Sequence, residues 1–174
     1  MTRILGVDPG LTRYGVGIID AANARSVSFV DVSVIRSPAD DPLEKRLLAI
    51  RDGLNVILDE FRPDVIAIGS STGGPQALFE VLSHLKGLSQ PILITQHMPA
   101  TFTKSFAARL DRISGAHVAE AHDGARLLPG HIYVAPGGDA HLEVVGSTHP
   151  TCRLREAAGL PTSASMPRSP GYGG

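Results

Sequence analysis

The spacing of apolar residues changes near residue 64, and this change constrains the fold more than any other feature of the sequence. Three short runs rich in β-branched residues come first, at 3–8, 14–20 and 27–35. A spacing of three and four residues follows between Leu43 and Phe61, which is typical of one apolar helix face. After residue 64, strand-like and helix-like runs alternate, at 65–68, 75–85, 92–95 and 102–113.

This order predicts a mixed α/β fold. Its largely parallel sheet would begin with an antiparallel three-strand meander and continue into Rossmann-like strand–helix units. Further strands are expected to extend the sheet, at 117–121, 131–135 and 142–145. We expect residues 147–174, which are rich in Pro, Gly and Ser, to form a largely disordered tail. A length of 174 residues favours one domain over two.

Composition narrows the function classes. The sequence has no apolar run that could cross a bilayer, so we expect a soluble cytoplasmic protein with no membrane insertion. A net charge of -1 argues mildly against DNA binding. Apart from His97, the histidines show no mutual metal-ligand spacing; they are His84, His117, His122, His131, His141 and His149. The oligomeric state stays open.

Two turns that follow strands carry residues with catalytic chemistry. Asp8 ends the first strand before Pro9-Gly10, which places a carboxylate at the carboxyl edge of the sheet, where α/β proteins bind ligands and metals. A second strand runs into a small-residue turn from Gly69 to Gly74 before a helix, which suits an anion or a nucleophile equally. His97 follows the next strand, where it could act as the base for a serine of that turn.

The segments ILGVDPGLTRYGVGIID, RSPADDPLEKRLLAIRDGL and RPDVIAI, within residues 1–68, resemble RuvC-type Holliday junction resolvases. The resemblance implies an RNase-H-like fold, branched DNA as partner and Mg²⁺ held by several carboxylates, of which Asp8 matches the first. Gly69 stands where that family has its second acid, and the tail after Glu156 contains no acidic residue. Nuclease activity is therefore expected to be impaired.

The segments GSSTGGPQAL, PILITQHMPATFTKSFAARLD and AHDGARLLPGHIYVAPGG, within residues 64–145, resemble CheB-type protein-glutamate methylesterases. The resemblance implies Ser71 as nucleophile and His97 as general base, with no cofactor. It also implies hydrolysis of methylated chemoreceptor glutamates through an acyl-enzyme. Residues expected to bind the substrate and the oxyanion are Ser70, Thr72, Gly73, Gly74 and Met98.

The methylesterase family's third catalytic residue is a downstream Asp that this chain lacks. We therefore expect a hybrid of a RuvC-like segment (1–68), a methylesterase-like segment (69–146) and a tail (147–174), folded as one domain. Three readings remain open: a weakened serine esterase, an inert scaffold and an impaired resolvase. Since the strand that ends at Asp8 should lie beside the strand that precedes Ser71, Asp8 is a further hypothesis for the missing triad acid.

Overall fold

The computed structural model describes residues 1–23, 25–70, 74–84, 87, 89–138, 140–146 and 149–156. The strands are β1 (Thr2–Asp8), β2 (Arg13–Asn23), β3 (Ser26–Arg36), β4 (Val65–Ser70), β5 (Ile92–Gln96), β6 (His117–Glu120), β7 (His131–Val134), β8 (Ala140–Val145) and β9 (Thr151–Glu156). The helices are α1 (Leu43–Phe61), α2 (Gly74–His84) and α3 (Ala100–Ser114). Among the described residues, none of the helices combines the length and hydrophobicity that a membrane span requires.

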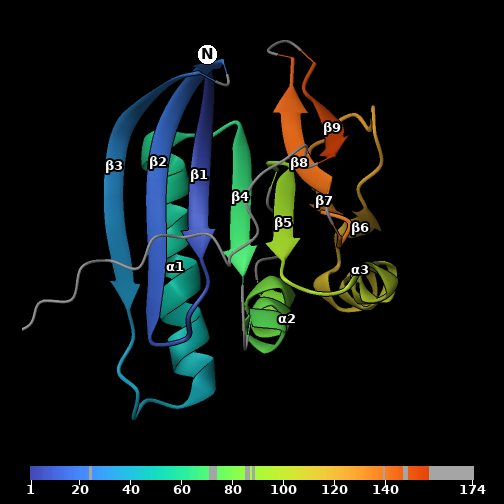
Figure 1. Ribbon diagram of the computed structural model, residues 1–174. Coiled ribbons are helices and arrows are strands. Elements are labelled where there is room, and N and C mark those ends of the chain that lie inside the picture. The colour runs from blue at the N-terminus through green and yellow to red at the C-terminus, as the bar shows by residue number, and fades with distance from the viewer. Residues whose placement is uncertain are drawn as a thin grey trace, which may run out of the picture.

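One mixed sheet joins the two halves of the chain, with strand order β3-β2-β1-β4-β5-β7-β6 (Figure 1). β1 to β3 form the antiparallel meander that the sequence predicts, and β1, β4, β5, β7 and β6 run parallel. β4 pairs with β1 along one edge and with β5 along the other, so this strand joins the resolvase-like part to the methylesterase-like part. The predicted fold class is confirmed.

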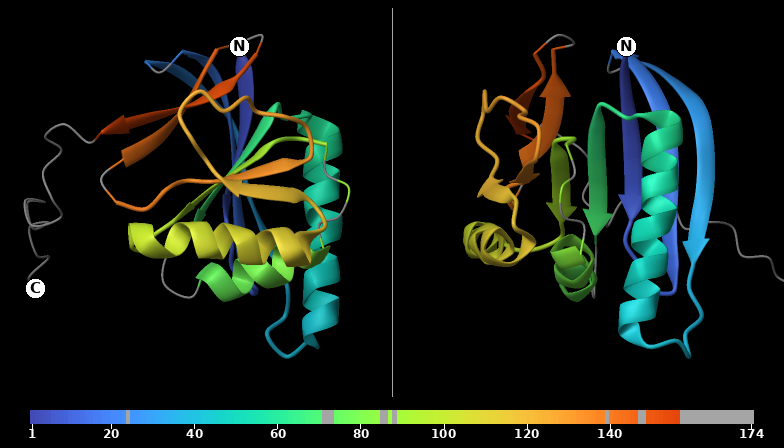
Figure 2. Two further views of the ribbon diagram at one scale, coloured as in Figure 1. Left: turned by 90° about the vertical axis from the view of Figure 1, so that its right-hand side faces the viewer. Right: turned by 180° about the vertical axis from the view of Figure 1, so that it is seen from behind.

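All three helices cover the same face of the sheet (Figure 2). Apolar residues of α1, α2 and α3 join inward-facing strand residues in one continuous core. That core includes Ile50 on α1, Leu78 on α2, Leu110 on α3 and Ile68 on β4, each at most 3% exposed. The hydrophobic interior therefore crosses from the N-terminal part of the chain into the C-terminal part.

The residues at the two ends of α1 show how this helix begins and ends. Asp41 before Pro42 is a typical helix-start signal, which predicts Asp41 as the capping residue. In the structure Pro42 occupies the cap position in an extended conformation and no side chain caps the helix, so this prediction is wrong. At the other end, Arg62 adopts a left-handed conformation at φ 46° and donates its N–H to the Leu58 carbonyl over 2.9 Å. Pro63 follows and ends the helix, as the sequence predicts.

Two predictions about the C-terminal part are wrong. β8 does not extend the main sheet, and instead pairs with β9 as a separate antiparallel hairpin. β9 lies inside the segment expected to be a tail. It forms because Cys152, which is 1% exposed, packs with Val65, Leu93 and Tyr133 in a second core on the face opposite the helices. The prediction for residues 157–174 falls outside the described residues.

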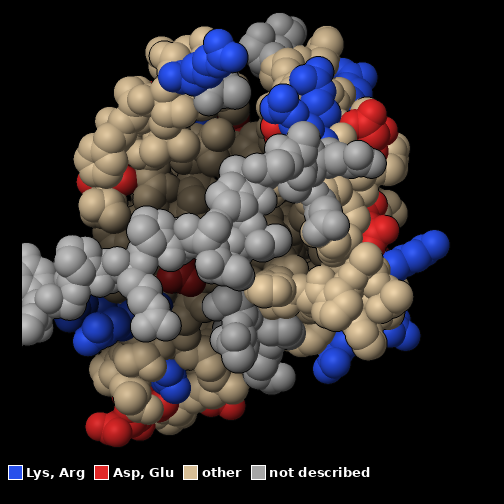
Figure 3. Space-filling model, in the orientation of Figure 1, with Lys and Arg blue, Asp and Glu red and all other residues tan. Residues whose placement is uncertain are grey.

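The N-terminal half of that second face stays open within the described residues. On β3, the side chains of Val27, Phe29, Val32 and Val34 are exposed. A groove of about 620 Å³ separates this part of the sheet from the hairpin. Figure 3 shows the hollow on this side of the molecule, with Lys, Arg, Asp and Glu side chains dispersed around it.

Candidate active site

The strand register brings the sequence-predicted residues to one edge of the sheet. Val7 pairs with Ile68, so Asp8 ends β1 at the level of Gly69 on β4. Gly69 in turn pairs with Thr95 on β5. Because parallel strands end at a common edge, the turns that follow β1, β4 and β5 meet there (Figure 1).

A backbone hydrogen bond joins the turn after β4 to the turn after β5. The His97 N–H donates to the Ser70 carbonyl oxygen over 3.3 Å, directly after the pairing of Ser70 with Gln96. The Ser70 hydroxyl is buried and has no hydrogen-bond partner among the described residues. Ser71, Thr72 and Gly73 lie outside the described residues, and α2 begins at Gly74. The structure therefore places the residue that precedes the predicted nucleophile beside His97.

A cleft of about 530 Å³ opens at this edge, which is large enough for a small organic group. The ends of β4 and β5 form one side of it, and the loop after β7 with the start of β8 forms the other. Its lining residues include Ser70, His97, Met98, Gly137 and His141. The His97 side chain is exposed, and Met98 is half-buried. Of the residues expected to bind substrate, the structure brings Ser70 and Met98 into the same cleft as His97.

Gly137, in the loop after β7 that lines this cleft, is packed closely against the backbone of the loop after β5. A Cβ at Gly137 would lie 2.5 Å from the Met98 carbonyl oxygen, so only glycine fits at this backbone approach. The Gly137 N–H donates to the Thr103 hydroxyl over 3.4 Å, and that hydroxyl in turn donates to the carboxylate of Glu120. Thr103 is fully buried on α3. Gly137 was not among the predicted site residues, although a Pro-Gly-Gly turn directly after a strand indicates a close backbone approach at the edge of the sheet.

Asp8 reaches the edge but not the His97 side of it. The Asp8 side chain is exposed, and β4 lies between it and β5. Adjacent strands are about 4.8 Å apart, so the backbones of β1 and β5 are on the order of 10 Å apart. No described carboxylate forms an ion pair with His97. A role of Asp8 as triad acid stays a prediction that requires the side chains to reach across β4.

The described residues do not fit a two-cation centre of the resolvase type. They contain no group of three or more His, Cys, Asp or Glu side chains that could hold a metal ion. Gly69, beside Asp8, has no side chain, and a Cβ built there would meet nothing within 4 Å. The neighbouring position that would supply a second carboxylate is therefore open space.

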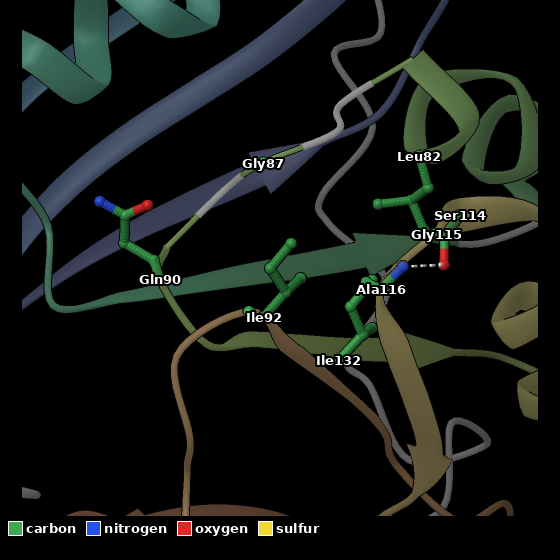
Figure 4. A pocket seen from close by; sticks show the side chains of 9 residues that line it. Leu82, Gly87, Gln90, Ile92, Ser114, Gly115, Ala116 and Ile132 are labelled. Atoms are coloured by element: carbon green, nitrogen blue, oxygen red, sulfur yellow. Dashed lines mark hydrogen bonds between the residues drawn. The ribbon is translucent and has the colours of Figure 1, made fainter.

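A second cavity lies at the opposite edge of the sheet, at the amino ends of β5 and β7. Its volume is about 220 Å³, and it is lined by side chains such as Leu82, Ile92 and Ile132 (Figure 4). The Ser114 hydroxyl accepts a hydrogen bond from the Ala116 N–H over 3.3 Å and is satisfied there. This cavity is remote from His97 and takes no part in the candidate site.

Comparisons with known proteins agree with the division seen in the sheet. A family model described as CheB methylesterase matches residues 66–167, more than half of the chain. A model described as crossover junction endodeoxyribonuclease RuvC matches residues 4–72. The two matches overlap at β4, the strand that joins the meander to the strand–helix units.

Relatives of known sequence match the methylesterase part. A protein-glutamate methylesterase/protein-glutamine glutaminase of Caulobacter vibrioides is 59% identical over 110 residues, covering 62% of this chain and 31% of the relative. A second, from Rhodospirillum centenum, is 61% identical over 98 residues, covering 56% of this chain and 25% of the relative. The chain thus spans about a third or less of the length of these relatives.

Two solved structures are similar to parts of this chain. The Thermotoga maritima CheB methylesterase catalytic domain is 42% identical, with a TM-score of 0.51, over 55% of this chain and 51% of that one. Thermus thermophilus RuvC in complex with a Holliday junction substrate is 18% identical, with a TM-score of 0.49, over 70% of this chain and 85% of that one. The chain is a hybrid that belongs to the CheB methylesterase family through residues 66–167 and carries a RuvC-like segment at residues 4–72.

Proposed function

We propose that this chain is a weakened serine-type carboxyl ester hydrolase, with Ser71 as nucleophile and His97 as general base. The observation that carries the proposal is the hydrogen bond from the His97 N–H to the Ser70 carbonyl, at the rim of a cleft of about 530 Å³. This bond holds the base beside the residue that precedes the nucleophile. A serine hydroxyl is a weak nucleophile until such a base removes its proton.

The proposed reaction forms and then hydrolyses an acyl-enzyme. His97 takes the proton of the Ser71 hydroxyl as its oxygen attacks the ester carbonyl, and then returns that proton to the departing methanol. Water attacks the acyl-enzyme with the same base, and releases the free carboxylate. Backbone N–H groups of the turn at Ser71, Thr72 and Gly73, ahead of Gly74 at the start of α2, would stabilise the oxyanion.

The proposed substrate is a glutamyl methyl ester on a chemoreceptor. The names of the Caulobacter and Rhodospirillum relatives indicate carboxyl ester hydrolysis at glutamate for those proteins. Gly137 and Gly138 present no side chain to the cleft, which leaves room beside the loop after β7 for an extended peptide. Met98 would contact the methylene groups of the glutamyl side chain.

The rate is expected to be low because no described residue supplies an orienting acid to the base. Removing the acid from a serine protease triad lowers turnover by about 10⁴ while leaving the nucleophile and base in place. No described carboxylate forms an ion pair with His97, so among the described residues its imidazole has no charged partner that would select the reactive tautomer. The nucleophile should still react with an electrophile that needs no turnover.

Fluorophosphonate labelling of the purified chain, read by intact mass, tests the proposal. We expect one covalent adduct, lost in both Ser71→Ala and His97→Ala, and retained in the matched control Ser105→Ala, a serine exposed on α3. Absence of labelling in a sample that unfolds cooperatively would refute the esterase and leave an inert scaffold. Labelling that survives Ser71→Ala would show reaction elsewhere and would also refute it.

The resolvase alternative rests on the position of Asp8 at the carboxyl edge of β1. It requires Mg²⁺ and branched DNA, and the described residues supply no carboxylate cluster for the ion. Incubation of the chain with a four-way DNA junction and Mg²⁺ should therefore yield no cleavage. Cleavage that disappears in Asp8→Asn would establish the alternative in place of this expectation.

A further inference from the structure

We infer that His117 and His131 form a two-imidazole site for a divalent transition-metal ion, preferentially Cu²⁺, at the outer edge of the sheet. The two residues are far apart for a sequence motif, but they are direct partners in the register of β6 and β7. β6 is the edge strand next to β7, as the left view of Figure 2 shows. This site is separate from the cleft at His97 and does not depend on the proposed esterase.

The two rings are already in contact. Their centroids lie 4.9 Å apart, with an angle of 66° between the ring planes. Metal–nitrogen bonds of about 2.0–2.1 Å place two ligand nitrogens of one ion roughly 3 Å apart, so small side-chain rotations suffice. Both rings line a cavity of about 340 Å³, and 68% of the His117 side chain is exposed, which leaves room for an ion and its waters.

Each imidazole has an oxygen on its Nδ1 side, at hydrogen-bond distance for His131 and farther away for His117, which leaves Nε2 as the candidate ligand atom. The His131 Nδ1 lies 3.0 Å from the Pro129 carbonyl oxygen, and since a carbonyl only accepts, Nδ1 carries the proton. The His117 Nδ1 lies 3.9 Å from Asp111 Oδ1, an atom that the Val118 N–H also holds at 2.7 Å. A carbonyl or carboxylate behind the ring is the usual outer shell of a metal-binding histidine.

The surroundings favour a small cation over an anion or an apolar ligand. Tyr133 stacks beside His131 with centroids 6.2 Å apart, and its hydroxyl already donates to the Arg126 carbonyl. The Arg126 guanidinium is directed at a ring nitrogen of His149, 3.0 Å away, and the Glu120 carboxylate that lines the same cavity offsets its positive charge. Two neutral imidazoles completed by water suit Cu²⁺ best, because affinity for nitrogen ligands rises to Cu²⁺ across the first row.

Calorimetric titration of Cu²⁺, Ni²⁺ and Zn²⁺ into the full chain at one fixed, near-neutral pH tests the inference, because metal affinity depends on pH. We expect one Cu²⁺ bound more tightly than either other ion, and an electron paramagnetic resonance spectrum with two nitrogen ligands. Asp111→Asn should weaken binding by about 10- to 100-fold. His117→Gln and His131→Gln should each abolish the one-equivalent binding, and His141→Gln, an exposed histidine of the other cleft, should leave it unchanged.

Circular dichroism of each variant separates metal loss from unfolding, because both sites lie on exposed or half-buried strand positions where glutamine is tolerated. Cu²⁺ binding that persists in folded His117→Gln and His131→Gln chains would overturn the inference. A spectrum with a single nitrogen ligand in the wild-type chain would overturn it as well.

Discussion

Replacement of Ile68 by alanine tests whether the two parts of the hybrid unfold as one domain. Ile68 is 3% exposed on β4, in the core that includes α1 from the RuvC-like segment and α2 from the methylesterase segment. Truncation of a buried Ile to Ala costs about 2–5 kcal/mol in unfolding free energy. In a chain of this length, each kcal/mol lowers the melting temperature by about 2–4 °C, so the expected decrease is roughly 4–20 °C.

The assay is urea unfolding combined with hydrogen exchange measured segment by segment. A single cooperative domain predicts one transition with an unchanged m-value, and an equal loss of protection in α1 and α2. Val32→Ala on β3, where the side chain is 66% exposed, is the matched control and should change stability by less than about 0.5 kcal/mol. Two separate transitions, or loss of protection confined to one helix, would refute the reasoning.

Three further predictions concern single residues. Gly69→Glu should fold normally, since a Cβ at this position meets nothing within 4 Å. The variant should place a second carboxylate beside Asp8 and so raise the affinity for Mg²⁺ in a calorimetric titration. Unchanged affinity would contradict this prediction. Gly137→Ala should lower the unfolding free energy in urea by about 1–3 kcal/mol, because the new Cβ would lie 2.5 Å from a carbonyl oxygen. Gly69→Ala is the control, and its unfolding free energy should change little. The Arg3 guanidinium, 2.8 Å from Asp20, lowers the pKa of that carboxyl group. The Asp20 carboxylate therefore stabilises the fold at pH values above the ordinary carboxyl pKa of about 3.9, and this contribution is lost as the pH falls through the lowered pKa. Asp20→Asn should therefore be less stable than wild type at pH 6, with a difference that shrinks below about pH 4; the same difference at both pH values would argue against the ion pair.

Local patterns predicted most of the elements, because their physical causes are local. The spacing of apolar residues between Leu43 and Phe61 located α1, and Pro63 marked its end. Alternating strand and helix runs predicted the parallel part of the sheet. The cap of α1 was predicted wrongly, since Pro42 rather than Asp41 occupies the cap position. Which of two neighbouring residues takes that position depends on how the preceding loop is anchored.

The separate hairpin could not be predicted from the residues around it. β8 has the composition of a strand that extends a sheet, and β9 lies in a segment rich in Pro, Gly and Ser. Cys152 becomes buried only because Leu93 and Tyr133, distant in sequence, present an apolar face to it. Such pairing depends on which surface remains uncovered after the main sheet has formed.

For the candidate site, the order of residues along the chain was enough to predict which residue types follow which strands, and hence that the turn after β4 lies near His97. Side-by-side parallel strands must end at one edge, so this much follows from chain order. The packing of Gly137 against a backbone carbonyl and the pairing of His117 with His131 became visible only in the folded chain. Those facts depend on strand register and on the close approach of distant backbones, and neither is encoded in the spacing of residues along the chain.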